Sequence, residues 1–376
     1  MRIAFYAPLK PPDHPVPSGD RRLGGLLMTA LRLAGHEVQL ASRFRSRDGA
    51  GDPARQQRLA VIGAKMAQRF MRNAQPAPQL WFTYHLYDKA PDYLGPRIAA
   101  ALRIPYVVAE ASVAPSRAGG AWAAGYDSVI AALRGAAAVI GVNDADAPCV
   151  LPVLSDPRRY HCLPPFLDIG PYVMARRGSA ERRAAVAAAC GIDATQPLLV
   201  ALAMMRPGAK LASYRLLADA LTPLVGKRWQ LLVIGDGAAR AEITAALAPL
   251  GAQAFFVGAV QEEAVPDLLG AADLMIWPAL DEAYGMALLE AQAAGVPVIA
   301  GRNPGTAGIV TDGITGLLAP PGDVAALTSR IAFLLDNPNR RNAFGEAAQR
   351  HVAARYDLPA AATRLGLILR QAACAF

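Results

Sequence analysis

The chain has 376 residues, of which 53% are hydrophobic and 18% are charged. That length allows two or three domains, and the composition is too apolar and too weakly charged for a disordered chain. The four cysteines form no C-x-x-C pair and the five histidines never approach ligand spacing, so we expect neither a disulfide framework nor a metal site. The net charge of +8 favours anionic partners such as nucleotides, nucleic acid or an acidic membrane face.

Neither a signal peptide nor a membrane span is expected. The apolar run at the N-terminus has five residues before its first proline, which is too short for the core of a signal peptide. The longest uncharged apolar stretch, 243–261, is interrupted by Pro249, Gly251 and Gln253, as a turn between two elements would be. We therefore expect a cytoplasmic protein.

The first half of the chain alternates short β-branched or aromatic runs with helical patterns. One βαβ unit is complete within 41 residues, because the helix that follows Ser18 carries one apolar stripe and stops at Gly35 before the next strand. This alternation predicts a parallel sheet. The expected strands are 2–6, 37–40, 80–83, 106–108 and 138–142.

The second half repeats the pattern after a segment rich in proline and arginine, so we predict two doubly wound α/β domains. We place the N-terminal domain at 1–170, a linker at 171–195, the C-terminal domain at 196–355, and a final helix, packed back on the first domain, at 356–376. Ligands of such sheets bind at the carboxyl ends of the strands. The expected strands of the second domain are 198–203, 229–234, 254–257, 274–277 and 296–300.

The loop after the first strand of the second domain carries two cations, Arg206 and Lys210, with a helix expected to begin near Leu211. Free N–H groups and the partial positive charge of a helix N-terminus complete an anion site that suits a diphosphate. The alternative is that both side chains are solvated loop cations.

Two glutamates follow the strand at 274–277. Glu282 lies in the loop at the strand's carboxyl end, and Glu290 lies on the helix that begins near Gly285. Carboxylates accept hydrogen bonds from sugar hydroxyls and grip a ribose diol, and Gly285 lets backbone N–H groups approach a phosphate. Alternatively, Glu282 is an acidic residue that interacts with the helix dipole in the first turn of a helix, and Glu290 lies on a solvated helix face.

Residues 278–298 combine these glutamates, with seven residues between them, and a following Ala-x-Ala-x-Gly-x-Pro-Val. This pattern resembles the signature of family 4 (group 1) retaining glycosyltransferases, which have the GT-B fold: two Rossmann-like parallel-sheet domains facing across a cleft. The resemblance continues through 255–260, 268–274 and 312–323. In the N-terminal half only the first βαβ unit and a glycine loop resemble the family, as expected if that domain handles a variable acceptor.

The resemblance implies roles for single residues. Glu282 would contact the donor sugar, Glu290 would hold the ribose of the nucleotide, and Arg206 with Lys210 would clamp the diphosphate. Further contacts are implied at Tyr284, Gly285 and Met286, as backbone donors to the sugar or phosphate, and at Ser18 and Gly19, in the glycine loop near phosphate and acceptor.

The chain departs from the family at two places. The spacing from Arg206 to Lys210 is shorter than usual, and Glu110 stands where relatives often carry a histidine near the transferred sugar. Glu110 would contact a sugar hydroxyl or act on the acceptor proton, or it only caps a helix. His85 is the nearest alternative imidazole and ranks second, because a histidine amid aromatic residues is more often packed in a core.

The implied reaction is hexosyl transfer with retention, in which the leaving diphosphate assists attack of the acceptor hydroxyl on the same face of the sugar. Arg206, Lys210 and helix N-termini would carry the charge, so we expect no metal and no cofactor beyond the nucleotide-sugar substrate. The product would be an exopolysaccharide or another glycoconjugate. The acceptor would be a glycan, a lipid-linked sugar or a small molecule, and we expect no nucleic-acid partner.

Residues 54–72 offer one hint about the acceptor. Cations line one face of the expected helix beside an apolar stripe of Leu59, Ile62, Met66 and Phe70. Such a helix can lie on an anionic membrane, here the inner face, and reach a lipid-linked acceptor. It can equally pack its stripe on the sheet with solvated arginines outside, which is the commoner arrangement.

Other enzymes and a non-catalytic protein remain as alternatives. A nucleotide-sugar epimerase on the same fold would need no acceptor. A dinucleotide dehydrogenase would need G-x-G-x-x-G after a strand, and the nearest match, 235–240, ends in arginine. A non-catalytic glycosyltransferase-like partner subunit is favoured by the short Arg206 to Lys210 loop and by Glu110.

Overall fold

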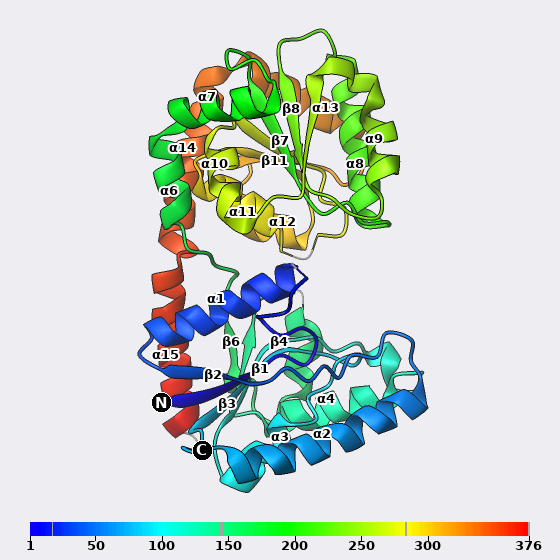
Figure 1. Ribbon diagram of the computed structural model, residues 1–376, viewed down its shortest axis with the longest axis vertical. Helices are drawn as coiled ribbons and strands as arrows, with labels where there is room; N and C mark the ends of the chain where they lie inside the picture. Colours follow the sequence, from blue (N-terminus) through cyan, green and yellow to red (C-terminus); the bar gives the residue numbers. More distant parts are fainter. Residues whose placement is uncertain (17, 143–145, 283, 375–376) are drawn as a thin grey trace. The chain divides into compact units, whose positions relative to one another are not determined.

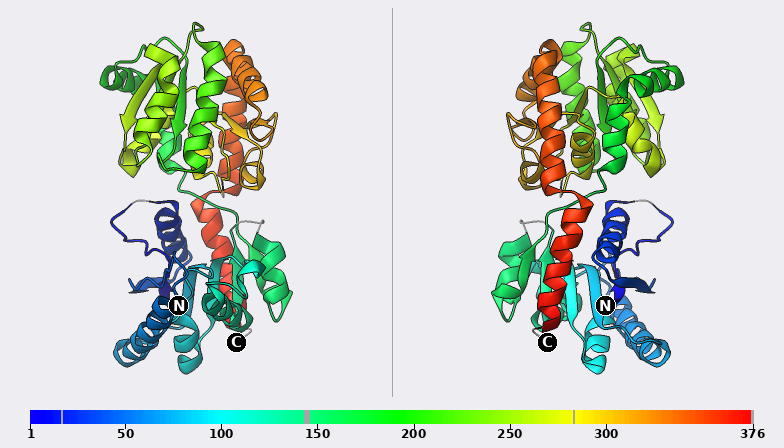
Figure 2. Two further views of the ribbon diagram at one scale, coloured as in Figure 1. Left: turned by 90° about the vertical axis from the view of Figure 1, so that its right-hand side faces the viewer. Right: turned by 90° about the vertical axis from the view of Figure 1, so that its left-hand side faces the viewer.

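The computed structural model describes the whole chain except residues 17, 143–145, 283 and 375–376. The chain divides into two compact units: unit 1 comprises Met1–Phe166 and Leu358–Phe376, and unit 2 comprises Leu167–Asp357. Each unit is a parallel six-stranded sheet with helices on both faces (Figure 1, Figure 2). The prediction of two Rossmann-like α/β domains is therefore confirmed. We describe each unit separately.

Unit 1 has the strand order β2-β1-β3-β4-β5-β6. Helix α1 packs with α15 on one side of the sheet, and α2 packs with α3 and α4 on the other. The strands are β1 (Arg2–Tyr6), β2 (Glu37–Ser42), β3 (Leu80–Leu86), β4 (Tyr106–Ala111), β5 (Ala138–Gly141) and β6 (Tyr160–Cys162). The helices are α1 (Gly19–Leu33), α2 (Pro53–Asn73), α3 (Gly95–Leu102), α4 (Ala123–Gly135), α5 (Ala147–Val150) and α15 (Leu358–Cys374).

Unit 2 has the strand order β12-β11-β10-β7-β8-β9, and its core is built from the Val-, Ile- and Leu-rich runs that a sheet buried on both faces requires. The strands are β7 (Leu198–Leu202), β8 (Gln230–Ile234), β9 (Ala254–Gly258), β10 (Leu274–Trp277), β11 (Val298–Gly301) and β12 (Gly316–Ala319). The helices are α6 (Gly170–Arg177), α7 (Ser179–Cys190), α8 (Ala209–Leu221), α9 (Arg240–Leu247), α10 (Val265–Gly270), α11 (Met286–Ala293), α12 (Pro304–Ile309), α13 (Val324–Asp336) and α14 (Pro338–Arg355).

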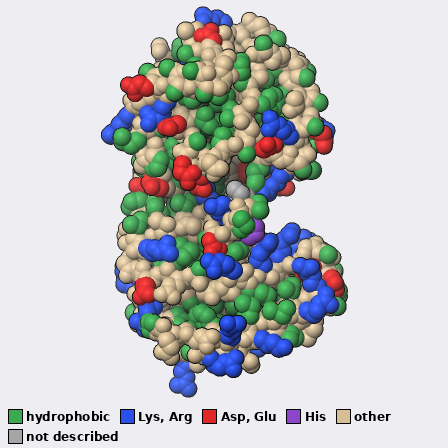
Figure 3. Space-filling model, viewed as in Figure 1, with side chains coloured by type: hydrophobic (Ala, Val, Ile, Leu, Met, Phe, Trp, Pro, Cys, Tyr) green, Lys and Arg blue, Asp and Glu red, His purple; other side chains and the backbone are tan. Residues whose placement is uncertain are grey.

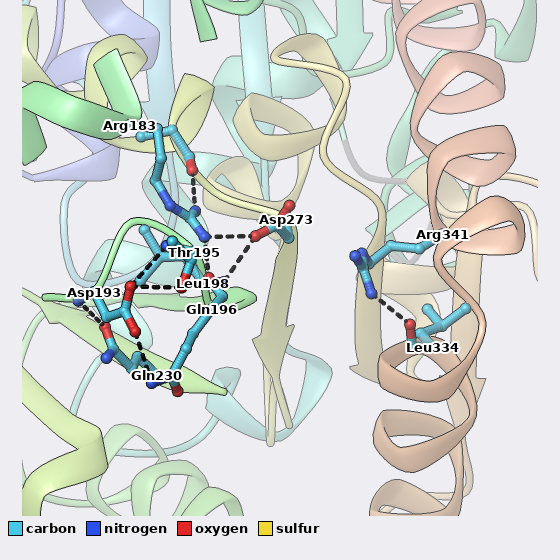
Figure 4. Close-up of polar contacts among 10 residues, drawn as sticks. Arg183, Asp193, Thr195, Gln196, Leu198, Gln230, Asp273, Leu334 and Arg341 are labelled. Carbon is cyan, nitrogen blue, oxygen red and sulfur yellow. Dashed lines mark hydrogen bonds and ion pairs between the residues drawn. The ribbon is translucent and has the colours of Figure 1, made fainter. Parts of the chain in front are cut away.

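The sequence predicts a linker with an arginine-rich helix at 171–195; the structure has helices there, α6 and α7, but they are part of unit 2. Tyr172 and Val186 are buried in the core of that unit. Figure 4 shows the side chain of Arg183 reaching from α7 to Asp273 and to the backbone oxygen of Gln196. The arginines that suggest a solvated linker therefore include one that fastens this segment to the domain.

The C-terminal helix α15 belongs to unit 1 and packs on α1, where a Cβ on Gly366 would lie 3.4 Å from the Cβ of Ala34. Within the described residues, no helix combines the length and the apolar character needed to span a bilayer.

Candidate active site

The strand order of unit 2 reverses between β7 and β10, the first strand of the unit and its fourth. In register, Leu274 pairs with Leu199 and Met275 with Val200, so these two strands end at the same edge of the sheet. Ligands of open α/β sheets bind at such a switch point, outside the carboxyl ends of the strands. The two loops that the sequence selects, 203–208 and 278–285, leave the sheet there.

Lys210 and Glu282 meet at this edge. The Lys210 Nζ forms an ion pair with Glu282 Oε2, although the two residues are 72 positions apart. The indole Nε1 of Trp277 donates a hydrogen bond to the same oxygen at 3.1 Å, and Lys210 Nζ lies 5.2 Å from the centre of the Trp277 ring. The carboxylate and the ammonium are thus fixed against each other by the last residue of β10.

Neighbouring elements fasten the loop that carries Glu282. Ser213 of α8 accepts a hydrogen bond from the Leu280 N–H at 3.0 Å, and the Asn303 side chain donates to the Ala279 carbonyl at 2.6 Å. Ala279 and Asp281 have positive φ angles of 56° and 54°. A left-handed conformation in residues other than glycine costs of order 1–3 kcal/mol, which the surrounding contacts must hold in place.

Arg206 is exposed, and in the described part of the chain its side chain makes no hydrogen bond or ion pair. The helix that follows begins at Ala209, two residues earlier than expected, so Lys210 stands in its first turn. The predicted grip of Arg206 and Lys210 on one diphosphate stays a prediction, because Lys210 is paired with Glu282 here.

The glycines of the G-x-G pattern support the loop before Arg206. A Cβ on Gly235 would lie 2.0 Å from the Ala203 carbonyl oxygen, and one on Gly237 would lie 2.4 Å from that of Met205. The Met205 N–H donates to the Asp236 carbonyl at 2.9 Å. The two glycines therefore allow close backbone packing. This requirement explains why the segment is similar to a dinucleotide fingerprint although it follows the wrong strand of its domain.

Helix α11 begins where the sequence predicts. Gly285, with φ 67° and ψ 40°, is its N-cap, and Met286 is its first residue, so the Met286 and Ala287 N–H groups have no partner one turn earlier in the helix. Tyr284 precedes the cap and is half-buried. Glu290 is only 2% exposed. It therefore does not lie on the solvated helix face that was its alternative interpretation.

Unit 1 gathers three titratable side chains at its own switch point, between β1 and β3. His85 Nδ1 lies 3.3 Å from Asp20 Oδ1 and 3.6 Å from Glu110 Oε1. The sequence ranks Glu110 and His85 as alternatives, whereas the structure places them in contact. The register, with Tyr84 opposite Ala109 and Leu86 opposite Ala111, sets the two side by side on neighbouring strands.

Ser18 and Gly19 begin helix α1. Ser18 is the N-cap, and its Oγ accepts a hydrogen bond from the Arg21 N–H at 3.3 Å. A Cβ on Gly19 would meet no atom within 4 Å. Pro17, which belongs to the predicted glycine loop, lies outside the described residues.

Sequence reasoning misses the residues that orient the others: Trp277, Ser213, Asn303 and Asp20. Only two of these residues have a sequence feature that could have pointed to them. Trp277 is an aromatic residue at a strand end followed by proline, and Asp20 is an acid in the first turn of a helix. Both are explained equally well by packing or capping, so the partners become visible only in three dimensions. In the described part of the chain, no group of three or more His, Cys, Asp or Glu side chains is arranged so that it could hold a metal ion.

Residues 195–351 match the family described as Glycosyl transferases group 1. This segment belongs to that family. A curated relative of the group 1 segment is the GDP-mannose-dependent monoacylated alpha-(1-6)-phosphatidylinositol monomannoside mannosyltransferase of Corynebacterium glutamicum, 36% identical over 148 residues. The match covers 38% of this chain and 39% of the relative, so the chain spans about two fifths of that protein's length.

Solved structures of similar fold cover the whole chain. Sucrose-phosphate synthase from Thermosynechococcus elongatus has a TM-score of 0.75 at 21% identity, over 100% of both chains. Anabaena Alr3699/HepE, solved in complex with UDP and glucose, has a TM-score of 0.74 at 16% identity, over 98% of this chain and 99% of its own. The group 1 segment thus lies in a chain with the GT-B fold.

Proposed function

We propose that this protein is a retaining hexosyltransferase that moves a sugar from a nucleotide-sugar donor to a hydroxyl group of an acceptor. The observation that carries the proposal is the pairing of Lys210 with Glu282 at the switch point of unit 2. A cation and a carboxylate at the same edge of the sheet suit such a donor. The cation compensates the charge of the diphosphate, and the carboxylate accepts hydrogen bonds from the sugar. The family of residues 195–351 supports the same reaction.

In this proposal the donor diphosphate takes over Lys210 from Glu282. The phosphate oxygens then bind Lys210, Arg206 and the N–H groups at the start of α11, and the freed Glu282 carboxylate accepts hydrogen bonds from the sugar. At an effective dielectric constant of about 20, a cation about 4 Å from a unit charge contributes about 4 kcal/mol before desolvation. That attraction grows as the diphosphate leaves with its charge, so it accelerates departure of the leaving group.

Glu290 is proposed to hold the ribose of the nucleotide. Its near-complete burial supports a specific role, because a carboxylate withdrawn from water is costly unless polar partners compensate it. The structures of Anabaena HepE with UDP and with UDP-glucose support a nucleotide sugar as the donor class.

The test compares wild type with Glu282→Gln, which keeps the shape of the side chain and removes its charge. Purified protein is incubated with UDP-, GDP- and ADP-sugars and a panel of sugar and polyol acceptors, and the anomeric configuration of the product is read by NMR. We expect transfer with retention in wild type and loss of at least 100-fold in kcat/KM in the variant. Free nucleotide with an epimerised sugar and no acceptor product would indicate an epimerase, and donor binding without turnover would indicate a non-catalytic subunit.

We also propose that α2 contacts an anionic membrane surface. The helix contains five cations and no acidic residue, and Val61 and Ile62 are each 45% exposed. Figure 3 shows Lys and Arg side chains along the part of unit 1 where α2 lies. Met66 and Phe70 instead pack against the core, so only part of the predicted apolar stripe faces outward. Exposed apolar residues among cations favour insertion at a headgroup boundary.

A further inference from the structure

A groove lies in unit 1 between helix α2 and β2, the strand at the edge of the sheet. Its volume is about 500 Å³. Residues of β1 and β2 form one wall, and the C-terminal half of α2 forms the other. The groove closes at the loop 74–79, which leads into the amino end of β3. None of the residues proposed above for sugar transfer lines it.

The hollow exists because the first two strands present small or polar side chains to α2. Ala4 belongs to the same core cluster as this helix, and Ala41 packs against that cluster. In the parallel register Ala4 lies beside Gln39. Because side chains alternate along a strand, Arg2 and Glu37 share that face of the sheet. None of these five is a large apolar residue, so space remains where α2 passes the sheet edge.

Helix α2 supplies the apolar wall of the groove. Met66 and Phe70 line it, one turn apart on the same helix face, and both are half-buried. The Phe70 ring is held by an edge contact with the Trp81 ring, with 5.4 Å between the ring centres. Ile62, which is 45% exposed, lies one turn earlier on that face. An apolar surface therefore leads from the exposed part of α2 into the groove.

A row of cations borders this apolar wall. Arg69 lines the groove, and Lys65 and Arg72 lie one turn to either side of it on α2. All three are exposed. Among the described residues that line the groove, Arg2 and Arg69 are balanced only by Glu37. Figure 3 shows hydrophobic side chains exposed on this side of unit 1, with Lys and Arg side chains around them. The groove thus has an apolar interior beside a cationic rim.

The size of the groove favours a thin ligand. Its α2 wall extends from Met66 to Ala74, which is about 12 Å at about 1.5 Å per residue. A helix about 10 Å across would fill about 900 Å³ over that length, nearly twice the volume present. A second copy of the chain is disfavoured too, because a twofold axis beside α2 would place its cations against themselves. An extended alkyl chain fits, since three bonds span about 3.6 Å and about ten bonds span the groove.

We propose that this groove binds one acyl chain of an anionic phospholipid, with the phosphate group held at the rim by Arg69. The inference goes beyond the proposed sugar transfer and shares with the proposed function only the contact of α2 with an anionic membrane. The chain lies on Met66 and Phe70, while Ile62 stays in contact with the bilayer. Lys65 and Arg72 attract neighbouring head groups. The lipid is an anchor rather than a substrate, bound apart from the switch points of both sheets.

The test measures binding of monomeric lysophosphatidylglycerols, with chains of about six to fourteen carbons, to the full chain by isothermal titration. Lysophosphatidylcholines of the same lengths probe the contribution of head-group charge. Ala41→Leu fills the groove. Its matched control is Ala54→Leu, which adds the same atoms at an exposed position of α2 outside the groove. Arg69→Gln is paired in the same way with Arg58→Gln, at an exposed arginine of α2 that does not line the groove.

We expect the affinity to rise with chain length up to about ten carbons and then to level off, because longer chains extend beyond the groove. Ala41→Leu should weaken binding of the ten-carbon lipid at least tenfold, and Arg69→Gln should weaken it roughly fivefold, while both controls stay within about twofold of wild type. The phosphatidylcholine analogue should bind more weakly than the phosphatidylglycerol one. Melting temperatures show whether each variant is folded, and if Ala41→Leu does not fold, the two arginine variants decide.

An affinity that keeps rising with chain length, or variants and controls that weaken binding equally, would overturn the inference. Either result indicates adsorption to the surface of α2 rather than binding in the groove. Transfer to a soluble acceptor by Ala41→Leu should equal that of wild type, so a failed groove prediction with intact transfer leaves the proposed function standing. A wild type that binds the lysolipids but turns over no donor would instead overturn the proposed transfer alone.

Discussion

Trp277→Phe offers a sharp test of how Glu282 is oriented. The substitution keeps an aromatic ring in the core, where Trp277 meets Tyr214 edge to face at 5.0 Å, but removes the Nε1–H that donates to Glu282 at 3.1 Å. The substitution changes no charge and leaves an aromatic ring near Lys210. If the carboxylate depends on this bond for its position, the reaction with the donor sugar should suffer although the fold remains.

The expected magnitude follows from the type of hydrogen bond. A bond to a charged acceptor contributes about 1.5 to 3 kcal/mol. Because 18% of the Glu282 side chain is exposed, water can replace part of the bond, so the lower half of that range applies. We therefore expect kcat/KM for the donor to fall by roughly 10- to 40-fold, since about 1.4 kcal/mol corresponds to a factor of ten.

Trp229→Phe is the matched control. Trp229 is also fully buried in unit 2 and donates its Nε1–H to the Leu224 carbonyl at 2.9 Å, but it lies at the amino end of β8. Both variants lose similar volume and one indole donor. Steady-state kinetics and melting temperatures separate the loss of activity from the loss of stability. Both variants should melt at a lower temperature, but only Trp277→Phe should also lower kcat/KM for the donor. Equal kinetic losses in the two variants would refute the reasoning.

Three further changes probe other parts of the account. Arg183→Met removes the contacts of α7 with Asp273 and backbone carbonyls, so unit 2 should lose about 2 to 3 kcal/mol, seen as a melting temperature lower by roughly 5 to 10 °C. Gly237→Ala drives a Cβ into the Met205 carbonyl and displaces the loop before Arg206, so kcat/KM should fall about 100-fold. Ile62→Asp should abolish sedimentation with phosphatidylglycerol vesicles without changing turnover of a soluble acceptor.

Each of these changes has an outcome that would count against it. An unchanged melting temperature in Arg183→Met would mean that the segment 171–195 is held by its apolar residues alone. The control for Gly237→Ala is Gly25→Ala, whose Cβ would meet nothing within 4 Å. Equal activity of these two would contradict the packing argument. Wild-type protein that binds phosphatidylcholine vesicles as well as phosphatidylglycerol vesicles would remove the electrostatic basis of the membrane proposal.

The strands were predictable where their apolar runs were long. The structure confirms the ten predicted strands to within a few residues, and β1 and β10 agree at both ends. Strands β6 and β12 were not predicted, because β6 has only three residues, none of them buried, and β12 begins with Gly316 and is followed directly by two prolines. Segment 171–195 belongs to unit 2 although the sequence predicts a linker. The prolines of 163–171 and the arginines that follow them indicate a linker, and nothing in the sequence marks Arg183 as a residue with buried partners.

The sequence predicts only those parts of the site whose positions follow from where the strands end. Lys210 and Glu282 follow two strands of one parallel sheet, and parallel strands bring their carboxyl ends to one edge, so their proximity follows from the topology. The contact of His85 with Glu110 depends on the register of β3 and β4 and on two left-handed residues. Neither leaves a trace in composition or periodicity. Asp20 joins them only because α1 starts beside β3.

Donor binding by unit 2 is the central claim, and ligand-induced stabilisation tests it most directly. Melting temperatures of wild type and Lys210→Met are measured with UDP-, GDP- and ADP-sugars at increasing concentration. A donor at 100 times its Kd should stabilise the wild type by about 2.7 kcal/mol, and Lys210→Met should need a much higher concentration for the same shift. Stabilisation that is equal in both proteins, or absent with every donor, would contradict the account.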